Sequence, residues 1–128
     1  MPLPRPLCTR LPGELEAELE ERFAALEWSP SEGLRNVVRE WLAAHRFREL
    51  EFRDTAFGRR AAVRGGPEVW EVAQVAGDER EIGERVESHF SWVGRDALVD
   101  ALAYAAAFPA EIGRILERNR RLAGGDAS

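Results

Sequence analysis

Residues that commonly carry catalysis or bind metal are few in this chain of 128 residues. The chain has two histidines, His45 and His89, and one cysteine, Cys8. None of them stands near another potential ligand at the spacing of a zinc site, and a single cysteine cannot form an internal disulfide. We therefore expect neither a metal ion nor a cofactor, and we expect His89 at the surface or at a helix end.

The carboxylates also lack the pattern of a catalytic pair. Four glutamates follow helical spacing and are typical of a solvated helix face: Glu79, Glu81, Glu84 and Glu87. The sequence contains no nucleophile motif, phosphate-binding loop or dinucleotide fingerprint. The pair Gly65-Gly66 is short enough to be a simple turn. We therefore predict that the protein is not an enzyme and has no catalytic residues.

Arginine is the distinctive residue type, because all 18 basic residues are arginine. A GC-rich genome explains this bias, although arginine also binds phosphate and carboxylate groups bidentately. Four arginines lie close to the C-terminus: Arg114, Arg118, Arg120 and Arg121. They either complement the dipole at a helix end or dock on an acidic nuclease pocket. The net charge of -5 argues against a protein coated in nucleic acid but allows a local basic face.

The sequence contains no targeting or membrane-spanning pattern. No apolar run approaches the roughly 18 residues that a bilayer-spanning helix needs. The N-terminus has Arg5 but lacks the apolar core of a secretory signal. We therefore expect a cytoplasmic protein without membrane contact.

A short strand and two amphipathic helices are predicted at the start of the chain. Residues 1–6 hold three prolines and form an extended arm. Residues 7–11 alternate in polarity, with Cys8 and Arg10 on the face opposite the apolar side chains. A first helix is predicted over 14–27. The second starts at Ser29-Pro30-Ser31-Glu32, a capping signal, and ends near Phe47.

The rest of the chain predicts a hairpin and four helices. Two strands, at 49–53 and 60–64, surround a turn at Gly58, and the helices cover about 69–76, 82–90, 94–108 and 109–121. The domain boundary is expected at 48–50, which gives domains over 1–48 and 49–121 and a tail over 122–128. Trp92 is expected in the core. The outward residues of the helix over 94–108 are expected to be Arg95, Asp96, Val99, Asp100 and Tyr104.

The first unit resembles the ribbon-helix-helix family of the MetJ/Arc/CopG type. The resemblance covers about a third of the chain and lies in Thr9-Arg10-Leu11-Pro12, in the stripe Leu15/Leu19/Phe23, and in Ser29-Pro30-Ser31-Glu32 with the apolar residues after it. It implies a homodimer formed by strand pairing that binds operator DNA. The DNA contacts it implies are Arg5, Cys8 and Arg10, with phosphate held at Ser29 and Ser31. Because Cys8 is a poor base reader, Arg10 is the main contact expected.

The second unit resembles a small bacterial domain, domain of unknown function 433, commonly found as a VapB-type antitoxin. The matching text is Phe52-Arg53-Asp54-Thr55, Gly58-Arg59-Arg60, Val69-Trp70-Glu71-Val72 and the segment from Ala101 to Ile112. The family is similar to helix-turn-helix domains, and its members often adjoin a gene for a PIN-like ribonuclease toxin. This sequence departs from it at Gly65-Gly66, where the family usually has a longer Gly-Thr-Arg turn.

Together the two resemblances predict a mainly α protein with short β elements. A ribbon-helix-helix unit would be followed by a β-hairpin and a helix-turn-helix-like domain of four helices. The expected function is that of a type II antitoxin that neutralises a PIN-like ribonuclease toxin and represses its own operon. The toxin would contact the four C-terminal arginines. Two alternatives stay open: a stand-alone ribbon-helix-helix regulator, and a dimeric interaction module that does not bind DNA.

Overall fold

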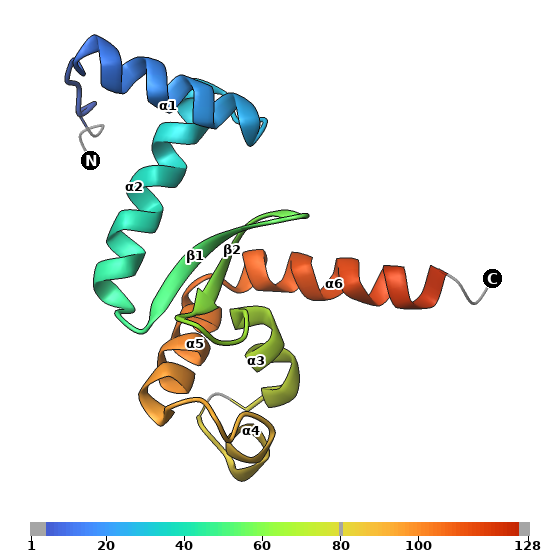
Figure 1. Ribbon diagram of the computed structural model, residues 1–128. Helices are drawn as coiled ribbons and strands as arrows, with labels where there is room; N and C mark the ends of the chain where they lie inside the picture. Colours follow the sequence, from blue (N-terminus) through green and yellow to red (C-terminus); the bar gives the residue numbers. More distant parts are fainter. Residues whose placement is uncertain (1–4, 80, 126–128) are drawn as a thin grey trace. The chain divides into compact units, whose positions relative to one another are not determined.

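The computed structural model describes residues 5–79 and 81–125 (Figure 1). This part of the chain is mainly helical, with six helices and one antiparallel sheet of two strands. The prediction of a mainly α protein with short β elements is confirmed. The chain forms two compact units, one up to Arg39 and the other from Glu40 onward. None of the described helices is both long and apolar enough to cross a membrane.

The first unit contains helix α1 (Gly13–Ala25) and the beginning of helix α2 (Pro30–Arg46). Its buried apolar side chain is Phe23, which contacts the Trp28 ring at a centroid distance of 6.1 Å. The same ring lies against Gly33, where an added Cβ would overlap it. Only glycine at position 33 therefore lets α2 approach α1 this closely.

The start of α2 follows the predicted capping signal. The Ser29 hydroxyl accepts a hydrogen bond from the backbone N–H of Glu32 at 3.2 Å, and Pro30 is the first helical residue. Proline suits this position because its missing N–H would have no partner inside the helix. The predicted strand over 7–11 has no partner strand in the described chain, and these residues have no regular secondary structure. A strand formed between two copies stays a prediction.

The second unit contains the hairpin of strands β1 (Leu50–Thr55) and β2 (Gly58–Val63). The strands pair in register from Leu50 opposite Val63 to Thr55 opposite Gly58. The turn itself is Ala56-Phe57, and Gly58 follows it with a φ of 104°, which glycine adopts without strain. Both strands were predicted, and the turn lies immediately before the residue expected to form it.

Four helices complete the second unit: α3 (Val69–Ala76), α4 (Glu84–His89), α5 (Arg95–Ala107) and α6 (Pro109–Gly125). The hairpin lies beside α3 and α5, and α6 follows α5 after the bend at Phe108-Pro109 (Figure 1). Helix α3 ends where predicted, at Gly77, whose φ is 61°. A contiguous core joins both strands to the four helices, and it includes Leu50, Val63, Val72, Leu98 and Ile112.

Two sequence predictions about aromatic residues in the second unit are wrong. Trp92 was expected in the core, but it is 70% exposed and contacts the Phe90 ring by an edge. Tyr104 was expected to face outward, but it is 1% exposed and lies between Phe47, Phe52 and Phe108. Its hydroxyl donates to Glu111 Oε2 at 2.5 Å, so the buried polar atom has a partner.

The division between the units falls inside α2, whereas the sequence places the domain boundary at 48–50. Ala43 and Phe47 explain the difference, because both are buried in the core of the second unit. A periodic helix gives no signal in the sequence when its two ends pack in different cores. The domain limits at 48 and 121 stay a prediction.

Candidate functional site

The residues predicted to read DNA are all exposed in the first unit. Arg5, Cys8 and Arg10 lie on the extended segment before α1, and Cys8 is a free thiol. Arg10 and Leu11 line a hollow of about 540 Å³ whose apolar walls come from Leu19, Phe23 and Leu34. The extended segment thus lies along the groove formed by α1 and α2, with the guanidinium-bearing residue at its surface.

The predicted phosphate site at the start of α2 has little hydrogen-bonding capacity left. Pro30 has no N–H, and the N–H of Glu32 already donates to the Ser29 hydroxyl. The N–H of Gly33 donates to the Ser29 carbonyl at 2.8 Å. Within the described part of the chain, Ser31 therefore offers the one open N–H of this turn. The carboxylate of Glu32 beside it opposes an anion.

The first unit also exposes large apolar side chains that a monomer has no reason to leave in water. Its apolar face, as we call it, consists of four residues on α1 and α2: Leu15, Leu34, Val37 and Val38. All four are exposed, and the three on α2 recur at helical spacing. Exposed apolar area of this kind on a helical surface marks a site of association.

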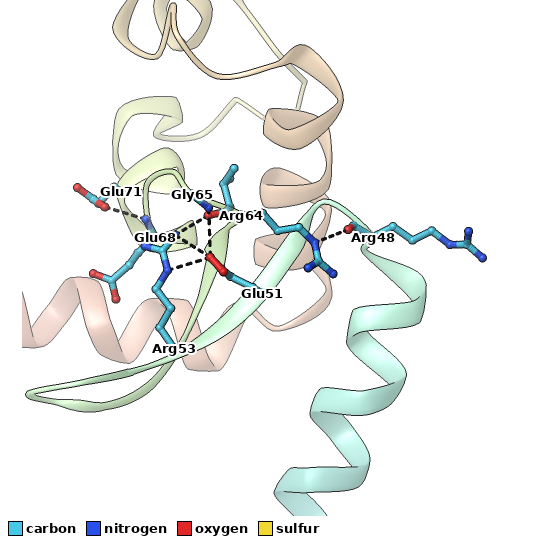
Figure 2. A network of polar contacts seen from close by, with 8 residues as sticks. Arg48, Glu51, Arg53, Arg64, Gly65, Glu68 and Glu71 are labelled. Carbon is cyan, nitrogen blue, oxygen red and sulfur yellow. Dashed lines mark hydrogen bonds and ion pairs between the residues drawn. The ribbon is translucent and has the colours of Figure 1, made fainter.

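A polar network fixes the base of the hairpin in the second unit (Figure 2). Glu51 Oε1 accepts from Arg53 Nη2 at 3.0 Å and from the N–H of Gly65 at 3.2 Å. The Gly65 N–H and then Arg53 lower the pKa of Glu51. Arg53 Nη2 also donates to the Val63 carbonyl at 2.7 Å, and Arg64 Nε donates to the Arg48 carbonyl at 3.0 Å. These contacts hold the turn at Gly65, as the sequence predicted, and have a structural role.

The structure does not bring the four predicted toxin-binding arginines of α6 together as one site. Arg120 and Arg121 both pair with Glu117, at 3.0 and 3.4 Å. Arg118 instead lies over the Phe57 ring at the tip of the hairpin, 4.6 Å from its centroid. Arg114 is exposed, and no ion pair joins it to another described residue. Of the four arginines, Arg120 and Arg121 are therefore neutralised by Glu117, whereas Arg118 lies at the hairpin.

The tip of the hairpin contains residues that the sequence analysis missed. Phe57 is 55% exposed, and Arg60 lies on the same ring at 5.5 Å from its centroid. The neighbouring Arg59 is engaged by Glu40 and by Asp54, the latter at 2.9 Å, and its bond to Glu40 is the main reason that the pKa of Arg59 is raised. The available signal was an aromatic turn residue followed by Gly58 and two arginines.

No part of the described chain offers a group of three or more histidine, cysteine, aspartate or glutamate side chains that could hold a metal ion.

Two of the residues on α5 that were predicted to face outward make polar contacts. Arg95 pairs with Glu87, and Asp100 accepts a hydrogen bond from the N–H of Glu49 at 3.0 Å. The first turn of α5 therefore presents a mixed surface. Comparison of the chain with models of protein families, with curated proteins and with solved structures found no match.

Proposed function

We propose that the protein is the antitoxin of a type II toxin-antitoxin module, with a dimerising N-terminal unit and a toxin-binding C-terminal unit. The observation that carries this proposal is the apolar face of the first unit, together with the burial of only one large apolar side chain, Phe23, among the residues described there. A helical unit of this size has too little buried surface to be stable alone. It gains that surface when a second copy covers the apolar face.

The extended segment before α1 supports strand pairing between two copies. It has no strand partner within the described chain, and Leu7 is fully exposed there. Pairing of two such segments in the ribbon-helix-helix manner would place Arg10 in the major groove of operator DNA. Arg5 and Cys8 would flank it, and Ser31 would offer its N–H to a phosphate at the start of α2.

The helical second unit would bind the toxin. In this interpretation the four helices form the helix-turn-helix-like domain, and α5 acts as scaffold because its Arg95 is already paired with Glu87. Two arginines of α6, Arg114 and Arg118, make no ion pair with a described residue. An acidic, metal-binding pocket of a PIN-like ribonuclease is the kind of surface that such arginines fit.

Co-expression with the neighbouring open reading frame tests the antitoxin function directly. We expect the two proteins to co-purify and the ribonuclease activity of the partner to disappear in the complex. Failure to form a complex at micromolar concentration contradicts the proposal.

DNA binding is tested separately by a gel shift on the region upstream of the gene. We expect Arg10→Ala to weaken the shift strongly and Arg22→Ala, an exposed arginine near the end of α1, to leave it unchanged. Equal affinity of the Arg10→Ala variant and the unchanged protein refutes the role given to Arg10.

One observation favours a second function, that of a dimeric interaction module without DNA binding. The first turn of α2 offers a single open N–H, at Ser31, next to the acidic Glu32. This is a weak phosphate site compared with a turn that has three free N–H groups. A dimer in solution that gives no shift with its own upstream DNA would establish this alternative. A stand-alone regulator would give the shift but no complex with the neighbouring gene product.

A further inference from the structure

The tip of the hairpin holds a cation that no described carboxylate neutralises. Arg60 is 7% exposed, yet its one described contact of an electrostatic kind is the Phe57 ring. It also stands directly opposite Arg53 in the strand register, and Arg53 is turned away toward Glu51 and the Val63 carbonyl. A buried charge without an ionic partner is costly, and a ring compensates for it only in part.

The guanidinium of Arg60 is nevertheless not completely sealed from solvent. A side-chain nitrogen or oxygen can be sealed from solvent and also lack a hydrogen bond. Among the described residues that are not exposed, this is true of Glu68 Oε1 alone and of no atom of Arg60. The nitrogens of Arg60 are therefore not sealed. Arg60 is buried as a whole, and the little surface that it leaves exposed includes nitrogens of its guanidinium, beside the Phe57 ring. Burial of the stem reduces the side-chain entropy that binding would otherwise remove.

Arg118, on α6, brings a second guanidinium to the same ring. Arg118 lies 61 residues beyond Phe57 in the sequence. Two cations and a half-exposed aromatic ring thus meet at one point. Neither cation makes an ion pair with a described carboxylate, in contrast to Arg59, which has Glu40 and Asp54. The cluster of Phe57, Arg60 and Arg118, which we call the tip cluster, has no carboxylate partner among the residues that the structure describes.

We propose that the tip cluster is the docking site for an acidic segment of a partner protein. The inference rests on the proposed antitoxin function and names the surface that the toxin contacts. A carboxylate of the partner binds between Arg60 and Arg118 through charge-assisted hydrogen bonds, and Phe57 packs on the apolar part of the same segment. Aromatic and arginine side chains are the types that dominate the binding energy of such interfaces.

Two observations favour a protein partner over nucleic acid at this site. Both guanidiniums lie over the Phe57 ring, so the ring face is less open to the stacking of a base. The net charge of -5 also repels a polyanion, whereas it affects a short acidic segment much less.

The test measures the affinity of the whole chain for the product of the neighbouring open reading frame by titration calorimetry. We expect Phe57→Ala and Arg118→Gln each to weaken binding about tenfold or more, as truncation of a central anchor does. Arg120→Gln is the matched control, because Arg120 lies on the same helix but pairs with Glu117, and it should change the affinity less than twofold. Arg118→Gln should also reduce the dependence of the affinity on salt.

Position 60 needs two variants, because its stem is part of the packed structure. Arg60→Gln should weaken binding at least as much as Arg118→Gln. If melting of that variant shows unfolding, Arg60→Lys keeps the charge but loses the planar fork, and it should weaken binding by a smaller factor.

The outcomes separate this inference from the proposed function. A complex that forms with unchanged affinity in Phe57→Ala and Arg118→Gln overturns the docking site and leaves the antitoxin function intact. Absence of any complex overturns both. If the same variants instead lose affinity for a single-stranded RNA of random sequence and keep their affinity for the protein, the site recognises nucleic acid and the proposal is wrong.

Discussion

The two units of this chain solve the problem of burying apolar surface in opposite ways. The first unit buries Phe23 and leaves its apolar face, from Leu15 to Val38, in contact with solvent. The second unit surrounds a contiguous core with a hairpin and four helices and contains the other buried apolar residues that the structure describes. The difference indicates that the second unit folds by itself, whereas the first unit needs a partner surface.

The charges of the two units differ in the same sense. Helix α1 carries five glutamates and a single arginine, and α6 carries four arginines and two glutamates. A strongly acidic helix stays soluble even when its apolar stripe is exposed to solvent, because the like charges of two copies repel each other and oppose non-specific association. The basic helix belongs to the unit with the contiguous core, and two of its four arginines, Arg114 and Arg118, make no ion pair with a described residue.

The comparison predicts the largest effect for truncation in the core of the second unit. Leu98→Ala should lower the free energy of unfolding by about 2–5 kcal/mol, because Leu98 is fully buried and its loss leaves a cavity. The matched change in the first unit is Leu34→Ala. Since Leu34 is half-exposed, this variant should leave the unfolding of the second unit unchanged and instead weaken association. Urea denaturation and sedimentation measure the two effects, and a smaller loss for Leu98→Ala than for Leu34→Ala would reverse the comparison.

Glycine 33 tests how far the first unit depends on one close approach. Gly33→Ala should destabilise the packing of α1 on α2 by about 1–3 kcal/mol, because the new methyl group overlaps the Phe23 ring. The fluorescence of Trp28, next to Phe23, would report the change. Gly113→Ala is the control, since that glycine lies within α6 and has open space around it. It should be neutral or slightly stabilising, and equal effects of the two variants would contradict the packing described here.

A smaller effect is expected when a single hydrogen bond in the second unit is removed. Tyr104→Phe keeps the aromatic packing but deletes the bond to Glu111. We expect a loss of about 1–2 kcal/mol in thermal unfolding, the usual size for a bond to a charged group that water can partly replace. Tyr104→Ala should cost several times more. A Tyr104→Phe variant as unstable as Tyr104→Ala would show that the hydroxyl carries most of the contribution of this side chain.

The smallest effect should appear in the decline of the melting temperature at acid pH. The Gly65 N–H and Arg53 lower the pKa of Glu51 below its ordinary value of 4.5. The stabilisation from this carboxylate is therefore complete above pH 4.5 and is lost as the pH falls through the lowered pKa. Glu51→Gln should flatten the decline of the melting temperature in that range and leave the neutral region nearly unchanged. A parallel acid limb in both proteins would rule out this role.

Local signals allowed much of the fold to be predicted from the sequence. Ser29 and Pro30 mark the start of α2, and Gly77 marks the end of α3, because capping and positive φ depend on adjacent residues alone. The hairpin was recognisable as two short strands around a turn at Gly58. Such features need no knowledge of the tertiary structure.

The errors in the prediction concern residues whose burial is decided by tertiary packing. Helix α5 is rich in alanine, so its apolar residues give no clear period, and Tyr104 could be assigned to either face. Trp92 lies in a turn without periodicity, and its size alone suggested burial. The contact between Phe57 and Arg118 could not be predicted, because the two residues meet only when α6 lies beside the hairpin.

The division of α2 between the two units limits how the protein can be dissected. A C-terminal fragment that begins at residue 49 lacks Ala43 and Phe47, and it would leave a void against Tyr104 in its core. A fragment that begins near residue 39 keeps both residues, together with Glu40 as partner for Arg59. Its shortened helix would lack the Ser29 cap and be held only by those side chains. A fragment that contains the second unit alone should therefore start inside a helix, although domain limits are usually placed in the linkers between helices.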